Sequence, residues 1–162
     1  MEIGMTSLDD FASAARSYCN WAEHADEQQS AKSEMQAARR YLAALYAIAV
    51  GLPPYECEWV ERPVSEDEWT EKYARFGALP VGDYGSICNP LQVPAGEAAL
   101  GDLADDLADI WRDLQEGLTI FEDGYRDAAG WQWQDSFSHW GEHALNALAI
   151  IHLWLTQNRY RE

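Results

Sequence analysis

Apolar residues that recur every three or four positions constrain the fold of this chain more than any other feature. The clearest case is segment 97–123, where leucines, an isoleucine and a phenylalanine fall on one helical face. The same period appears in segments that begin near Ser7 and Ser30 and in segment 131–158, and Ser65-x-x-Glu68 is a capping box before a shorter periodic stretch. The pattern therefore predicts an all-α fold with four long helices and one short helix.

The two long C-terminal segments are joined by a short turn with glycines at Gly124 and Gly130. Two long helices with a short link form an antiparallel hairpin, so we expect a helical bundle that ends in such a hairpin. Residues 77–96 are rich in glycine and proline, which predicts a loop, and a short strand at 85–88 stays open. A length of 162 residues suits a single helical domain over 1–162.

The charge balance excludes several classes of partner. The chain has 28 acidic and 11 basic residues, a net charge of −17, which opposes binding to nucleic acid and to anionic membrane surfaces. No apolar run is long enough for a membrane span, and residues 1–4 do not resemble the start of a secretory signal. Three widely spaced cysteines predict reduced thiols, so we expect a bacterial cytoplasmic protein. A cation or a basic protein remains as a partner, or the charge serves solubility alone.

The polar face of the 97–123 helix consists almost entirely of carboxylates. Successive residues of a helix are rotated by about 100° around its axis, and on this basis the other acidic residues lie within about 60° of the direction of Asp102. Arg112 is the single basic residue between Gly101 and Asp123, and it lies off this face. Like charges at this spacing destabilise a helix, so the stripe is either a solvated face, a binding face or part of a metal site. The acidic stripe comprises Asp102, Asp105, Asp106, Asp109, Asp113 and Glu116.

The 131–158 helix carries two histidines on its polar side. His139 and His143 are four residues apart, so both imidazoles can reach one point. Glu142 lies between them, but a zinc protease needs glutamate directly after the first histidine, which excludes that motif. A pair at this spacing is typical of a metal site and equally of a structural pair bonded to carboxylates.

Folding the predicted hairpin brings the histidines to the acidic stripe. If the turn centres near residue 127, His139 lies level with Asp113 and His143 lies level with Asp109. Mixed nitrogen and oxygen ligands suit zinc, iron, nickel or manganese. Our hypothesis is a divalent transition metal site made of Asp109, Asp113, His139 and His143. The alternative is a pair of Asp–His hydrogen bonds that tie the two helices together.

The same two helices carry a family resemblance. Segments 101–117 and 137–144 resemble the bacterial domain of unknown function (DUF) 5063 family, which often has tyrosine where this chain has Trp111. Similar stretches at 11–19 and 45–53 extend the resemblance over most of the chain. The resemblance implies a helical domain, assigns no activity, and supports the aspartates and histidines as one unit.

Three functions from different classes remain open. The first is an acidic interaction or binding module, and the second is a divalent-metal-binding domain, with or without enzymatic activity. The third is an acidic inhibitor or immunity-type protein that masks a basic target. Elemental analysis of protein purified without chelator separates the second from the others most directly.

Overall fold

The structure, a computed structural model, describes residues 6–24 and 29–160, so the residues behind the expectation about a secretory signal lie outside it. The predicted all-α class is confirmed, because helices dominate and the one sheet has two short strands. No helix in the described part of the chain is both long and apolar enough to cross a membrane. The elements are α1 (Leu8–Glu23), α2 (Ala31–Ala49), α3 (Glu66–Phe76), β1 (Asp83–Ser86), β2 (Ala99–Asp102), α4 (Leu103–Glu122), α5 (Arg126–Asp135) and α6 (Phe137–Gln157).

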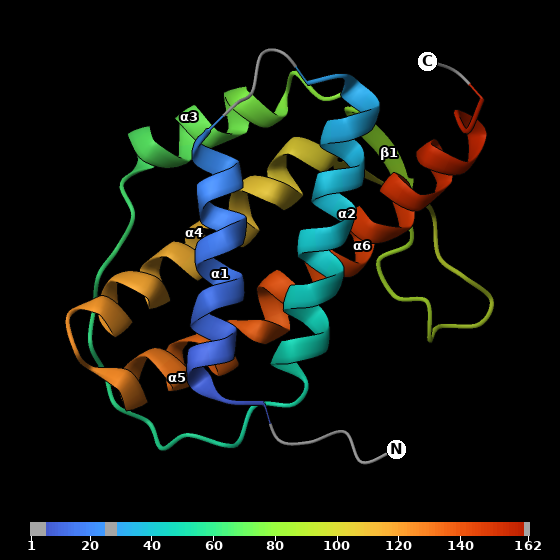
Figure 1. The fold of residues 1–162 in the computed structure, drawn as a ribbon. Helices are drawn as coiled ribbons and strands as arrows, with labels where there is room; N and C mark the ends of the chain where they lie inside the picture. The colour runs from blue at the N-terminus through green and yellow to red at the C-terminus, as the bar shows by residue number, and fades with distance from the viewer. Residues whose placement is uncertain (1–5, 25–28, 161–162) are drawn as a thin grey trace.

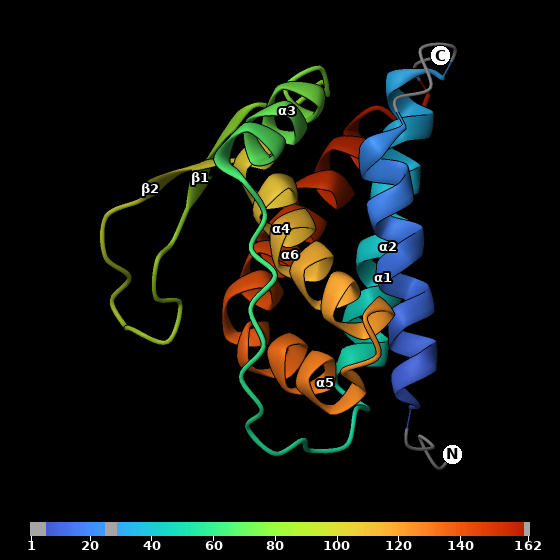
Figure 2. The same cartoon turned by 90° about the vertical axis from the view of Figure 1, so that its left-hand side faces the viewer.

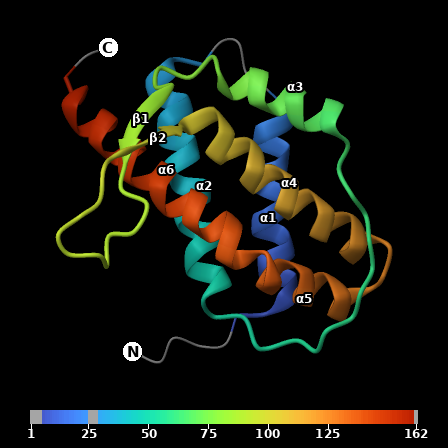
Figure 3. The same ribbon diagram turned by 180° about the vertical axis from the view of Figure 1, so that it is seen from behind.

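The four long helices form two layers, with α1 beside α2 and α4 beside α6 (Figures 1 and 2). Helix α3 lies alongside α4, and α5 follows α4 and packs against it (Figure 3). The strands β1 and β2 form a hairpin whose loop projects away from the bundle (Figure 2). Helix α4 packs against α1, α3, α5 and α6, so it is the central helix of the domain.

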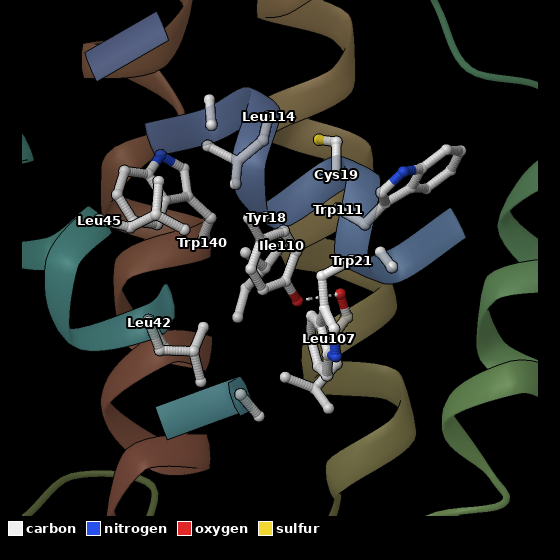
Figure 4. Close-up of a cluster of buried hydrophobic side chains, with 14 of the residues drawn as sticks. Tyr18, Cys19, Trp21, Leu42, Leu45, Leu107, Ile110, Trp111, Leu114 and Trp140 are labelled. Atoms are coloured by element: carbon white, nitrogen blue, oxygen red, sulfur yellow. Dashed lines mark hydrogen bonds between the residues drawn. The ribbon is translucent and has the colours of Figure 1, made fainter. Parts of the chain in front are cut away.

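Aromatic side chains fill the space between the two layers. Trp133, Trp140 and Tyr18 are among the largest fully buried residues. The hydroxyl of Tyr18 donates a hydrogen bond to the backbone oxygen of Leu107 at 2.8 Å, as the dashed line in Figure 4 marks. A buried hydroxyl needs such a partner, and this one fixes α1 against α4 from within the core.

Helix α4 begins at Leu103, six residues later than the sequence pattern predicts. The side chain of Asp102 accepts the backbone N–H of Ala104 at 2.9 Å, which caps the helix there. Residues 99–102, which include the cap residue, pair with β1 instead, in the antiparallel register that sets Tyr84 against Gly101. The first strand covers 83–86, two residues before the stretch that the sequence left open.

The predicted 131–158 helix is two helices, because the chain bends at Ser136. The hydroxyl of Ser136 donates to the backbone oxygen of Gln132 at 2.7 Å, and a serine that bonds back in this way bends a helix. Helix α5 also begins at Arg126, in the segment that the sequence assigned to a turn. The domain therefore has four long helices and two short ones in its described residues, in place of four and one.

Candidate metal centre

Three of the six residues of the acidic stripe are buried, and the other three are partly exposed. Asp106, Asp109 and Asp113 are 4%, 8% and 9% exposed, which is rare for carboxylates unless they are paired. They face the side of α4 on which α3, α6 and the β-hairpin pack. The stripe is therefore an internal polar layer at its centre, and a solvated acidic face does not describe it.

Each end of the stripe is held by a hydrogen bond to a neighbouring element. The hydroxyl of Tyr73 on α3 donates to Asp102 at 2.7 Å, and the backbone N–H of Val64 donates to Glu116 at 3.3 Å. Burial raises the pKa of Glu116 and also that of Asp105, whose pKa the charge of Asp109 raises further. These contacts attach α3 and the segment before it along the length of α4.

The two carboxylate oxygens of Asp109 contact different groups of residues. Its Oδ1 accepts the indole N–H of Trp69 at 2.9 Å and an N–H of Arg112 at 2.6 Å. Its Oδ2 faces α6, with the Nε2 of His143 at 3.4 Å and the Nε2 of His139 at 3.5 Å. Two donors on one oxygen fix the carboxylate so that the other oxygen points at the histidine pair.

Both imidazoles are oriented by a second carboxylate behind them. The Nδ1 of His139 lies 2.7 Å from Asp113 and the Nδ1 of His143 lies 2.6 Å from Asp106. Because an ionised carboxylate only accepts, each Nδ1 carries the proton and donates it. A histidine held through Nδ1 by a carboxylate presents the lone pair of Nε2, which is the arrangement that metal-ligating histidines use.

The two Nε2 atoms lie 3.2 Å apart and complete a triangle with Oδ2 of Asp109. Asp109, His139 and His143 form a group whose potential ligand atoms all lie within 4.8 Å of one another. Ligand atoms bound at about 2.1 Å in a tetrahedron lie about 3.4 Å apart, close to the three sides of this triangle. The arrangement can therefore accept a small divalent cation with little movement.

The site contains a residue that sequence reasoning did not identify. Tyr84 on β1 donates its hydroxyl to Oδ2 of Asp106, the carboxylate that orients His143. Burial, and next the hydrogen bond to Asp106, raise the pKa of Tyr84 well above its usual range. A Cβ at Gly101 would collide with the Tyr84 ring, so glycine at this strand position allows the ring to lie across β2. Gly101 was a weak indication of this contact in the sequence, because its role becomes clear only when β2 is seen to pair with β1.

The contacts of His143 differ in part from the prediction. His139 contacts Asp113 as predicted, whereas His143 contacts Asp106 as well as Asp109. The bend at Ser136 changes the path of α6, which a straight hairpin does not anticipate. As a result Asp113 contacts the Nδ1 atom of His139 and does not belong to the group formed by Asp109, His139 and His143.

The electrostatics favour a cation at the centre of the triangle. The hydrogen bond from Asp106 raises the pKa of His143, and burial partly opposes that rise. Burial also raises the pKa of Asp113, against the lowering effect of its hydrogen bond to His139. With both Nδ1 atoms protonated, two nitrogen lone pairs and a carboxylate oxygen face one another at 3.2–3.5 Å. Such a cluster is stable when a proton or a metal ion lies between its members.

A family model described as Domain of unknown function (DUF5063) matches residues 5–157. The chain belongs to this family. The crystal structure of protein BF1032 from Bacteroides fragilis is similar to this DUF5063 domain, with a TM-score of 0.73, 22% sequence identity and coverage of 89% of each chain. That similarity concerns the fold. No curated protein matches the chain significantly.

Proposed function

We propose that this DUF5063 domain binds one divalent transition metal ion between α4 and α6. The ligands are Oδ2 of Asp109 and the Nε2 atoms of His139 and His143. The observation that carries the proposal is the convergence of these three atoms at 3.2–3.5 Å while both Nδ1 atoms are held by carboxylates. Two imidazole nitrogens and one carboxylate oxygen suit zinc or iron(II) best.

A purely structural role for the histidines leaves part of this geometry unexplained. Hydrogen bonds from Nδ1 to Asp113 and Asp106 would by themselves tie α6 to α4. They do not by themselves require the two Nε2 atoms to face each other and Asp109, and the 3.2 Å contact between the Nε2 atoms needs either a proton or a metal ion between them. The side chain of His139 is also 47% exposed, so this ring could turn to solvent at little cost. A metal ion explains why both rings point inward.

Charge balance supports the same conclusion. Asp106, Asp109 and Asp113 lie together in a largely buried layer, and Arg112 forms an ion pair with Asp109. Buried carboxylates without compensation are costly to ionise. A divalent cation would supply positive charge at the point where the ligand atoms meet.

Metal titration of chelator-treated protein tests the proposal. Wild type should bind one zinc or cobalt(II) ion per chain and melt at a higher temperature when loaded, because the metal binds only the folded state. His139→Gln and His143→Gln should each abolish both effects. His152→Gln is the control, since His152 lies on the exposed side of the same helix. Wild-type binding no tighter than that of the two variants would refute the proposal.

The acidic binding module remains as a second candidate, and it includes the inhibitor or immunity-type version. The net charge of −17 favours a basic protein partner and disfavours nucleic acid. Burial of Asp106, Asp109 and Asp113 removes the middle of the stripe as its docking surface. A basic partner should therefore dissociate as salt rises but still bind Asp109→Asn. Failure to retain any basic partner at low salt would count against this candidate.

A bacterial cytoplasmic setting is part of the same proposal. Cys19, Cys57 and Cys88 are all free, although two of them are exposed. Free exposed thiols suit a reducing compartment.

A further inference from the structure

Among residues 6–24 and 29–160 the proposed metal would have three protein ligands, and the site is open to solvent beside His139. Asp106 and Asp113, the nearest other carboxylates, are occupied by the Nδ1 atoms of the histidines. The half-exposed side chain of His139 shows that solvent reaches this side of the site. Three protein ligands with an accessible remaining position are typical of metal sites that bind an exogenous ligand.

Arg112 lies beside the carboxylate ligand Asp109 and is partly exposed. Its guanidinium donates one hydrogen bond to Oδ1 of Asp109 at 2.6 Å, and its side chain is 32% exposed. It also lies 5.8 Å from the ring of Trp69, which restricts its position. A guanidinium has five N–H donors, and Asp109 is the one hydrogen-bond acceptor it meets within residues 6–24 and 29–160. Donors therefore remain for a second acceptor beside the metal.

We infer that the domain binds a small oxyanion, a carboxylate or a phosphate, through the open metal position and the guanidinium of Arg112 together. This inference rests on the proposed metal site. One oxygen of the anion coordinates the metal and a second accepts N–H bonds from Arg112. The distances suit such a bridge, because Asp109 itself joins the two groups in this way, with Oδ2 toward the metal position and Oδ1 on Arg112. Arg112 is then the positioning group for an anionic ligand.

The sequence context agrees with this role. Arg112 is the one basic residue between Gly101 and Asp123 in the sequence, and it stands one helical turn after the carboxylate ligand. A planar guanidinium binds carboxylate and phosphate groups through two parallel hydrogen bonds, which lysine cannot do. A residue needed only to neutralise Asp109 would not have to be arginine or partly exposed.

Cobalt(II)-loaded protein tests the inference, because visible absorption reports on both metal binding and added ligands. Acetate and inorganic phosphate are titrated separately, and imidazole serves as a neutral ligand that needs only the metal. Because Arg112 also holds Oδ1 of the Asp109 ligand, the cobalt(II) affinity of Arg112→Gln is measured first, and the anions are titrated into protein that is saturated with cobalt(II). The oxyanion affinity should fall about 10- to 100-fold, imidazole affinity should not change, and Arg112→Lys should lie between the two proteins.

Each result has a distinct meaning. Arg16→Gln removes the same charge from a partly exposed arginine on α1, paired with Glu122, and should bind both anions as wild type does. A cobalt(II) spectrum that neither acetate nor phosphate alters would overturn the anion site and leave the metal site standing. Equal oxyanion affinity in Arg112→Gln would overturn the role of Arg112. Absence of cobalt(II) binding to wild type would overturn both proposals.

Discussion

The Nε2 atoms of His139 and His143 face each other at 3.2 Å, and their rings are nearly perpendicular, with an interplanar angle of 81°. One turn of α6 separates the two residues, but spacing alone does not make the rings converge. Asp113 and Asp106 on α4 hold the far side of each ring and set this orientation. The metal proposal, the oxyanion inference and the first three predictions below depend on this relationship.

The first prediction concerns the carboxylates behind the histidines. Asp106→Asn and Asp113→Asn should each weaken zinc binding about 10- to 100-fold while the protein stays folded, because an amide holds Nδ1 less firmly. Competition with a chromogenic chelator measures the affinities. Asp102→Asn is the matched control, because it removes the same charge from the same stripe at a residue that contacts Tyr73 and neither histidine. Asparagine also caps a helix, so the cap of α4 is kept. Equal losses in all three variants would indicate a general charge effect.

The second prediction is the pH dependence of metal affinity. An imidazole must lose its second proton to bind metal, and the hydrogen bond to Asp106 raises the pKa of His143. Zinc affinity should therefore begin to fall at a higher pH than the value of about 6.5 for an ordinary histidine. Zinc titrations between about pH 5.5 and 8.5 measure this. A constant affinity over that range would contradict the assignment of His143 as a ligand.

The third prediction has the opposite sign, because it concerns the metal-free protein. A histidine whose pKa is higher in the folded state stabilises the fold fully below its unfolded pKa of about 6.5. That stability is lost as pH rises through the folded pKa of His143. With chelator present, the difference in unfolding free energy between wild type and His143→Gln should shrink from pH 6 toward pH 9. Urea denaturation measures it, and a difference that grows with pH would disprove the shift.

The fourth prediction tests the hairpin as a support of the site. Gly101→Ala should destabilise the protein by about 1–3 kcal/mol, because the new methyl group displaces the ring of Tyr84. Tyr84→Phe should cost about 1 kcal/mol, since Asp106 loses a hydrogen-bond donor. Chemical denaturation measures both values.

Gly85→Ala is the control for the hairpin, because it lies in β1 beside Tyr84 and a methyl group there meets no atom within 4 Å. It should leave stability nearly unchanged. If Gly85→Ala were as destabilising as Gly101→Ala, the loss at Gly101 could not be assigned to contact with Tyr84.

The comparison of sequence and structure is most informative at the helix ends. Serine caps at Ser7, Ser30 and Ser65 are local signals, and all three cap the helices that follow them. The predicted start of α4 was six residues too early. Residues 99–102 pair with β1, and the side chain of Asp102 caps the helix at that point. Strand pairing of residues about fifteen positions apart is not visible in helical periodicity.

The candidate site shows the same division. His139, His143 and Asp109 could be selected from i,i+4 spacing and an assumed hairpin, and the structure brings them together. The roles of Asp113 and Asp106 could not be assigned, because the bend at Ser136 shifts the register between α4 and α6. Tyr84 and Trp69 come from elements that do not neighbour α6 in sequence, and only packing places them on the carboxylates.

The sequence by itself determined the helical class, the positions of most helices and which residues are candidates for a metal site. These properties depend on periodicity, capping and side-chain chemistry, which act over a few residues. Tertiary structure alone decided that the acidic stripe is mostly buried, that α4 is central, and which oxygen or nitrogen of each side chain faces the others. Burial and the orientation of individual atoms depend on which distant elements pack against a helix. The charge pattern of one helix does not show which elements these are.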